Sequence, residues 1–297
     1  MKISLINIDS KITNLALAKI AKYHTDKGDE VIWDMPIIPA DKTYVSCVFT
    51  KNRRLAEQWE GKAAIGGSGY SLDVKLPKEI ESVKPRINYG FTTRGCIRNC
   101  GFCIVPQKEG KIRIVGDLLD LWDGKSRDVV VMDNNILALP EHFEKICNQA
   151  IENNIRIDFN QGLDCRLLTD KIVELLTKIS HKEYHFAFDN PSSFHNVERA
   201  IWLLRRNGIK RSCWYVLCGF GTTFEQDLER CEYLKSEGQN VFVQRYETVY
   251  RRPEYIALAR WANQHHIFQG MTLKQFMGEE IRRSKGVEDY IGCVARV

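Results

Sequence analysis

Hydrophobic and polar positions alternate in a regular rhythm from residue 87 onward. Short apolar runs of strand length recur, and each is followed by a segment with apolar residues at helical spacing. The expected strands span residues 87–92, 128–132, 155–159, 184–188, 212–217 and 240–244. The expected helices span residues 115–122, 142–153, 170–179, 194–207, 224–236 and 254–264. Because a strand that is followed by a crossover helix pairs in parallel with the next strand, the pattern predicts an incomplete (β/α)6 TIM-like barrel over residues 86–269.

The first 85 residues have the pattern of a smaller α/β unit. Strands are expected at residues 3–8, 31–33 and 44–49, and helices at residues 15–27 and 54–59. The second helix leads to residues 63–65 and a glycine-rich turn at 66–69. This order predicts a parallel sheet with helices on its faces, a Rossmann- or flavodoxin-like domain over residues 1–85. The charged stretch at residues 78–84, between two prolines, is expected to be a linker. Residues 270–297 form a C-terminal tail with a helix expected at 273–284.

Composition narrows the class of protein but does not identify a partner. Hydrophobic residues make up 44% and charged residues 27% of the 297 residues, which is typical of a globular protein without a membrane segment. The first apolar run soon meets Asp9 and is expected to be a buried strand, not a signal peptide, so a cytoplasmic location is expected. The net charge of +5 is compatible with a nucleic acid or phosphate-bearing substrate, but also with neither.

The cysteines fall into two groups. Seven of the ten stand singly in apolar stretches and are expected to be buried, reduced thiols. Cys96, Cys100 and Cys103 instead share one loop with the spacing C-x3-C-x2-C, directly after the first expected barrel strand. Three such thiols can bind three corners of an iron–sulfur cube and leave the fourth iron without a protein ligand. A structural zinc site would need a fourth ligand, and the next candidates, His142 and Cys147, form no close pair with ligand spacing.

The loop resembles the hallmark of the radical S-adenosylmethionine (SAM) superfamily, C-x3-C-x-aromatic-C, with Phe102 as the aromatic residue. The stretch from Gly90 to Cys96 is similar to the subgroup with a cobalamin-binding-like N-terminal domain. The resemblance implies a [4Fe–4S] cluster on Cys96, Cys100 and Cys103, with SAM bound to the open iron. It also implies reductive cleavage of SAM to methionine and a 5′-deoxyadenosyl radical, with electrons from a flavodoxin- or ferredoxin-type reductant protein.

The resemblance further implies SAM contacts just beyond the carboxyl ends of the expected strands. Arg166 could pair with the SAM carboxylate, or form a salt bridge at a helix start. Asp189 could bind the ribose hydroxyls, or form an Asx turn before Pro191. The glycine motif at the fifth strand lacks the usual proline, so only Leu217 and Gly219 are carried over from it. The complete set of expected contacts is Phe102, Asp133, Asn134, Gln161, Arg166, Asp189, Leu217, Gly219 and Tyr246.

Two activities of related enzymes do not match the N-terminal segment. Cobalamin-binding domains supply an axial histidine from a D-x-H-x-x-G loop, whereas His24 lies inside an expected helix without the matching Asp and Gly. We therefore expect no bound cobalamin. Sulfur insertion through a second N-terminal cluster requires three cysteines, and residues 1–85 contain only Cys47, so methylthiolation of that kind is not expected.

The leading hypothesis is a radical SAM enzyme acting on an unidentified substrate. Basic residues interleave with Tyr246, Tyr250, Tyr255 and Trp261, as in a surface for a nucleic acid or nucleotide, although solvated helix ends and barrel packing are the preferred explanation. A non-catalytic iron–sulfur protein for electron transfer is the first alternative, and it would need a fourth cysteine near the cluster. A zinc-stabilised nucleic-acid-binding module is the second, and metal analysis would distinguish it from the others.

Overall fold

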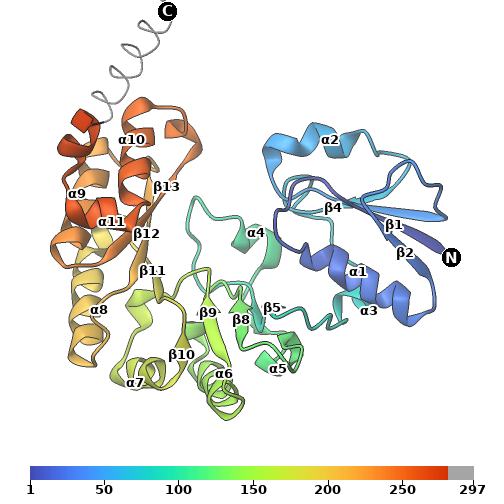
Figure 1. The fold of residues 1–297 in the computed structure, drawn as a ribbon, viewed down its shortest axis with the longest axis horizontal. Coiled ribbons are helices and arrows are strands. Elements are labelled where there is room, and N and C mark those ends of the chain that lie inside the picture. Colours follow the sequence, from blue (N-terminus) through green and yellow to red (C-terminus); the bar gives the residue numbers. More distant parts are fainter. Residues whose placement is uncertain (280–297) are drawn as a thin grey trace, which may run out of the picture. The chain divides into compact units, whose positions relative to one another are not determined.

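A computed structural model describes residues 1–279 of the chain and divides it into two compact units, Met1–Asn134 and Asn135–Val297 (Figure 1). Both units combine helices with parallel strands, which confirms the predicted α/β class. The predicted domain limits at residues 85 and 269, and the incomplete barrel itself, stay predictions. Along residues 1–279, no helix has the length and apolar character needed to cross a membrane.

The first unit begins with a four-stranded parallel sheet in the order β2-β1-β3-β4. Its strands are β1 (Lys2–Asn7), β2 (Glu30–Trp33), β3 (Lys42–Ser46) and β4 (Ala64–Gly66). Strand β1 is an inner strand and buries Ile3 and Leu5 on one face and Ser4 and Ile6 on the other, as expected for a parallel strand that is covered on both faces. Helix α1 (Leu15–Asp26) packs on this sheet and begins at Asn14, whose side chain accepts the Leu17 N–H. The predicted strand–helix–strand–strand order is thus confirmed.

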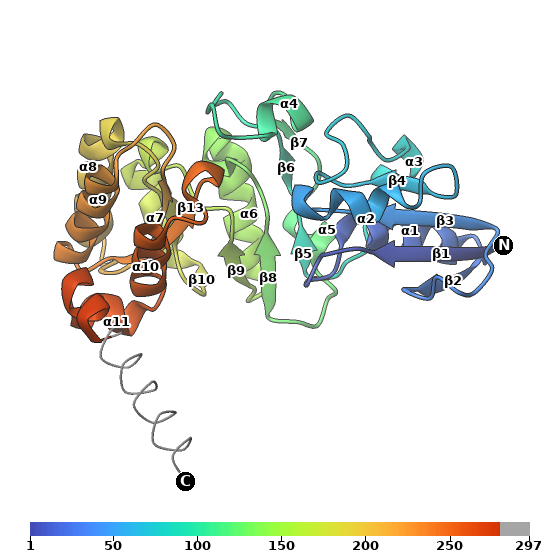
Figure 2. The same cartoon turned by 90° about the horizontal axis from the view of Figure 1, so that it is seen from above.

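Helices α1 and α2 (Arg53–Glu57) lie on opposite sides of this sheet (Figure 2). A further short helix, α3 (Lys78–Glu81), occupies part of the stretch predicted to be a linker. The linker prediction is wrong there because Ile80, the apolar residue of α3, is only 3% exposed and joins the core of the unit. The other buried members of that core are Ile3, Leu5, Leu17, Ile20 and Tyr44.

The remainder of the first unit carries two short pairs of strands. Strand β5 (Tyr89–Gly90) pairs in parallel with β8 (Asp128–Val131), so the strand predicted at 87–92 is shorter than expected. Strands β6 (Thr93–Arg94) and β7 (Arg113–Ile114) form an antiparallel ribbon that the sequence pattern did not predict. Helices α4 (Val105–Glu109) and α5 (Leu118–Leu121) complete this part.

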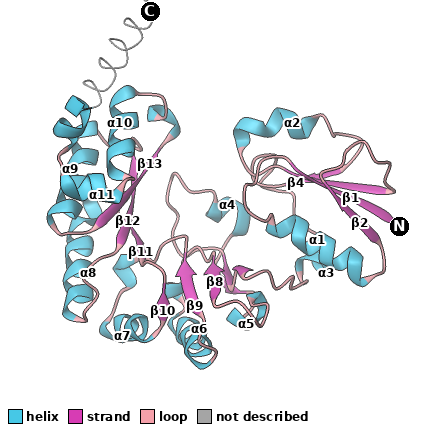
Figure 3. Cartoon of the chain, viewed as in Figure 1, coloured by secondary structure: helices cyan, strands magenta, loops and turns pink. Residues whose placement is uncertain are grey.

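The second unit contains parallel strands with helices packed against them (Figure 3). Strand β9 (Arg156–Phe159) pairs with β10 (Ser180–His181), and β11 (His185–Ala187), β12 (Cys213–Cys218) and β13 (Asn240–Arg245) form a three-stranded sheet. The helices are α6 (Pro140–Glu152), α7 (Asp170–Lys178), α8 (Phe194–Arg206), α9 (Phe224–Ser236), α10 (Pro253–Ala262) and α11 (His265–Gly270). Apart from the unpredicted β10 and α11, these elements confirm the predicted alternation.

Capping residues explain where the helices of the second unit begin. Thr169 accepts the Ile172 N–H at the start of α7, and Thr223 forms a capping box with Gln226 at the start of α9. Helices α9 and α10 pack on β12 and β13, with Trp261 and Leu258 buried in that layer. Residues 273–279 are helical, and the rest of the helix predicted at 273–284 lies outside the described residues.

Candidate active site

The three cysteines of the motif lie on a loop, residues 95–112, whose two ends are held together by the β6–β7 ribbon. Cys96, Cys100 and Cys103 are half-buried there, and Phe102 beside them is also half-buried. The other described cysteines, which are Cys47, Cys147, Cys165, Cys213, Cys218 and Cys231, are all buried, as predicted. Cys293 lies outside the described residues. The two groups of cysteines therefore differ in access to a cofactor.

The ribbon and a glycine fix the start of this loop. Gly95 has a φ of +83°, and a Cβ at this position would lie 2.3 Å from the Lys111 carbonyl oxygen, so the chain cannot close here with a larger residue. The Gly95 N–H donates to the Glu109 carboxylate (3.0 Å), and the Cys96 N–H donates to the Gly110 carbonyl (3.2 Å). The Arg94 guanidinium lies 3.2 Å from Glu109. These contacts join both ends of the cysteine loop.

Burial also affects the chemical state of the thiols outside the motif. Burial raises the pKa of Cys147 and of Cys165 to about 12, so these thiols stay protonated and unreactive. On the loop, the Arg98 N–H donates to the Cys96 Sγ over 3.3 Å. Amide donors of this kind are a common way in which proteins tune metal-bound sulfur.

Asp133 and Asn134 follow β8 in the first unit, where the sequence places them. The Asp133 carboxylate is 5% exposed and accepts the N–H groups of Thr92 (2.7 Å) and Thr93 (2.9 Å). Burial raises the pKa of Asp133, although these hydrogen bonds oppose the rise. The Asn134 side-chain amide donates to Glu109 (2.8 Å). Both residues therefore hold the segment that leads into the cysteine loop, and their expected contacts with SAM stay predictions.

Gln161 and Arg166 follow β9 in the second unit. Arg166 forms a forked pair with Asp164, in which Nε and Nη2 lie 2.6 Å and 3.0 Å from the two carboxylate oxygens. This is the salt bridge that the sequence left open as the alternative to a SAM contact. Asp164 also caps the following 3₁₀ turn by accepting the Arg166 N–H. Gln161 is exposed, and its side chain lies 3.5 Å from that of Asn160.

The ends of β11, β12 and β13 bring four more expected residues into neighbouring positions. The Leu217 N–H donates to Asp189 over 3.3 Å, and burial raises the pKa of Asp189 while this hydrogen bond and a nearby arginine limit the rise. Gly219 has a φ of +82°, and a Cβ there would lie 2.4 Å from the Val249 side chain. Tyr246 is half-buried, and its N–H joins the end of β13 to the carbonyl of the residue before Gly219.

A buried ion pair that the sequence interpretation missed supports these strand ends. Arg230 and Asp227 of α9 are 1% and 0% exposed and lie 2.5 Å apart. Arg230 also donates to the carbonyls of Phe188 and Leu217, and Asp227 accepts the Gly219 N–H over 2.8 Å. The pair thus fixes the backbone beside the expected SAM contacts. The sequence does carry a sign of this pair, because two charged residues occupy the face of α9 that is expected to be apolar.

No protein-family model matches the chain. A curated relative is 28% identical over 169 residues, the tRNA-2-methylthio-N(6)-dimethylallyladenosine synthase of Aquifex aeolicus, a radical SAM enzyme. This match supports the predicted resemblance to the radical SAM superfamily, and it supports a radical SAM function in general terms.

The match to this radical SAM relative is partial in both directions. It covers 52% of this chain and 34% of the relative, so the chain spans about a third of the relative's length. The relative's substrate therefore enters only as a basis for the proposals below. The predicted subgroup with a cobalamin-binding-like domain also stays a prediction.

Proposed function

We propose that this chain is a radical SAM enzyme that binds a [4Fe–4S] cluster through Cys96, Cys100 and Cys103, and uses SAM as its co-substrate. The observation that carries the proposal is the half-buried position of these three thiols on one loop that is closed at its base by β6 and β7. When bound, the cluster and SAM supply one-electron chemistry that yields methionine and a 5′-deoxyadenosyl radical able to abstract a substrate hydrogen. A flavodoxin- or ferredoxin-type protein is the proposed electron donor.

The chemistry of the donor set fits a cluster with one open iron. The three accessible thiols lie within eight consecutive positions. Cys47, the cysteine of residues 1–85, is unsuited as a ligand. Its thiol is buried and donates to the Phe49 carbonyl (3.4 Å), and burial together with Asp9 raises its pKa to about 11. A second cluster in this segment, of the kind required for sulfur insertion, does not fit these residues.

Residues of the chain would bind and orient SAM. Asp189, Leu217, Gly219 and Tyr246 occupy the carboxyl ends of strands, where ligands of α/β proteins bind. The half-buried Asp189 carboxylate accepts a backbone N–H but keeps acceptor capacity for ribose hydroxyls. The remaining proposed contacts are Phe102, Asp133, Asn134, Gln161 and Arg166.

We infer further that the substrate is a nucleoside within an RNA. The support is the relative, whose name describes a tRNA adenosine product, together with an exposed aromatic side chain near the end of β13. There Arg245 lies over the ring of Tyr250 at 4.5 Å, and Tyr250 is 54% exposed. Aromatic rings with a neighbouring guanidinium are the side chains on which unpaired bases stack.

Anaerobic reconstitution tests the cluster. We expect about four irons and four sulfides per chain, and loss of the bound cluster when Cys96, Cys100 or Cys103 is replaced by alanine. Cys147→Ala is the matched control, because that thiol is buried in α6 and should leave the iron content unchanged. A full cluster in any of the three loop variants would remove the motif from its proposed role.

A SAM cleavage assay tests whether the protein is a radical SAM enzyme or an electron-transfer protein. The reduced, cluster-loaded protein should release 5′-deoxyadenosine from SAM even without substrate, because an uncoupled radical is quenched. A protein that holds the cluster but releases no nucleoside under several reductants would instead be an electron-transfer protein.

A binding assay tests the proposed RNA substrate. Tyr250→Ala should weaken RNA binding by about tenfold, since a base stack contributes about 1–3 kcal/mol. Equal binding of RNA by Tyr250→Ala and wild type would contradict this surface.

A further inference from the structure

A second group of potential metal ligands lies at the opposite ends of the strands in the second unit. His185 is the first residue of β11, and Cys213 is the first residue of β12 and its partner in the strand register. Asn240, the first residue of β13, continues this row as the register partner of Cys213. Glu183 precedes β11 by two positions. Neighbouring parallel strands lie about 4.8 Å apart, so the row brings different side chains together at one edge of the sheet.

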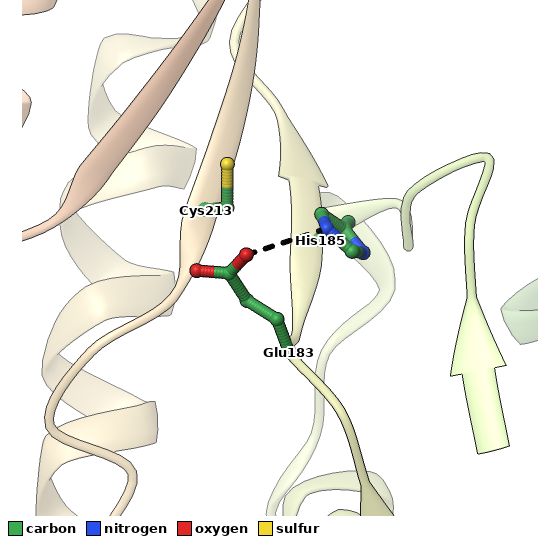
Figure 4. A group of neighbouring side chains, drawn as sticks. All are labelled: Glu183, His185 and Cys213. Carbon is green, nitrogen blue, oxygen red and sulfur yellow. Dashed lines mark ion pairs between the residues drawn. The ribbon is translucent and has the colours of Figure 1, made fainter. Parts of the chain in front are cut away.

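The ligand atoms of Glu183, His185 and Cys213 all lie within 4.8 Å of one another (Figure 4). The His185 Nε2 is 3.7 Å from a Glu183 carboxylate oxygen. Two ligands of a tetrahedral zinc ion lie roughly 3.3–3.7 Å from each other, given metal–ligand bonds of about 2.0–2.3 Å. The three atoms therefore need only small side-chain adjustments to share one ion. His265 can supply a donor for a fourth position, with its Nε2 3.9 Å from the Cys213 Sγ.

Polar groups next to His185 and Glu183 are arranged as they are around a metal-bound histidine. The Asp158 carboxylate lies 3.5 Å from the His185 Nδ1, and these two atoms are buried without a hydrogen-bond partner in the structure. The Asn240 amide donates to Glu183 over 3.2 Å. The ring of Tyr215 stacks on His185 at 5.3 Å with an interplanar angle of 12°. Binding of a cation at Nε2 would place the Nδ1 proton toward Asp158, which gives both orphaned atoms a partner.

We propose that Glu183, His185 and Cys213 form a zinc site, separate from the proposed cluster and SAM contacts. A donor set of one thiolate, one imidazole and one carboxylate matches zinc better than magnesium or calcium, which prefer oxygen ligands alone. A cavity of about 580 Å³ is lined by Glu183 and His185, together with Asp158 and Arg211, so an ion can reach two of the three proposed ligands from it.

Binding exchanges a proton for the metal. The ion displaces the Cys213 thiol proton to solvent and forms the Zn–S bond, without any change in oxidation state.

The site differs in position and role from the active-site residues proposed above. Cys213 and Cys218 are the two ends of β12, and five residue steps separate them by roughly 16 Å. A zinc ion at Cys213 would tie β11 to β12 at the ends where the strands begin. The expected role is therefore structural.

The test uses the full-length chain with Cys96, Cys100 and Cys103 replaced by serine, so that the cluster loop cannot bind the probe. Co²⁺ is titrated, its thiolate charge-transfer absorption is recorded, and Zn²⁺ is then added as a competitor. We expect one Co²⁺ per chain with a single-thiolate band. In this background, Cys213→Ser should abolish the band and weaken zinc binding by about 100-fold, and Asp158→Asn should weaken it by about tenfold. Cys147→Ser is the matched buried-thiol control and should retain the band.

Absence of a thiolate band in the parent, or an unchanged band in Cys213→Ser, would overturn the proposal. If circular dichroism shows that Cys213→Ser is unfolded, Glu183→Gln tests the site instead. The side chain at position 183 is half-exposed, and glutamine keeps a carbonyl oxygen that can accept the hydrogen bond from Asn240. Zinc binding at least tenfold weaker in Glu183→Gln supports the site, and equal binding refutes it. Since the parent lacks the loop cysteines, these results are independent of whether the cluster proposal holds.

Discussion

Replacing Arg230 by methionine tests whether the buried pair with Asp227 holds the second unit together. Methionine fills most of the space but leaves the Asp227 carboxylate, which is 0% exposed, without its cation. Breaking a buried ion pair on one side costs about 3–5 kcal/mol, because the remaining charge stays desolvated. For a unit of this size, that loss lowers the melting temperature by roughly 6–20 °C.

Urea unfolding followed by circular dichroism gives the free energy of unfolding for this variant. Arg205→Met is the matched control, since Arg205 is 46% exposed and pairs with Glu237 on the surface, where such pairs contribute about 0–1 kcal/mol. Adding Asp227→Leu to Arg230→Met should restore part of the lost stability by removing the uncompensated charge. A loss below about 1 kcal/mol in Arg230→Met, equal to the control, would refute the reasoning.

Four further results are expected. Gly95→Ala should abolish cluster binding, because its Cβ meets backbone that cannot move aside, and iron analysis of the reconstituted variant checks this. Gly219→Ala should cost about 1–3 kcal/mol in unfolding free energy, since the new Cβ overlaps a neighbouring side chain, and an unchanged urea midpoint would contradict the contact. Hydroxocobalamin should separate completely from the protein on gel filtration, whereas stoichiometric retention would make methyl transfer the leading reaction. Burial raises the pKa of Asp9, but N–H donors from Val48 and Phe49 outweigh it and hold the pKa below its ordinary value. The stability that Asp9 contributes is thus present above its unfolded pKa of about 4 and lost as pH falls through the lower folded value, so Asp9→Asn should flatten the acid side of the pH–stability curve.

Long periodic elements were predictable from the sequence, whereas short ones were not. Helices α8 and α9 bury a regular stripe, and β12 is a run of apolar residues, so hydrophobic spacing locates them. Strands β6, β7 and β10 each contain two residues, too few to show any period. Their existence depends on partners distant in the chain.

The candidate site divides in the same way. The spacing of Cys96, Cys100 and Cys103 is local, so their shared loop could be predicted. The hydrogen-bond partners of Asp133 could not be predicted from the sequence. The two threonines that donate to Asp133 lie about forty positions earlier, and they meet it only through the pairing of β5 with β8. Glu109 was missed for the same reason, since its role comes from contacts with Arg94 and Asn134.

The antiparallel pairing of β6 with β7 bears on the order in which the proposed cluster would be assembled. The ribbon makes residues 95–112 a closed loop as soon as the first unit folds. Most of the entropy of loop closure is then lost during folding, not when metal binds. A short tether also keeps the three thiols at high effective concentration for iron that arrives later. The polypeptide can therefore reach its folded form first and receive iron and sulfide afterwards.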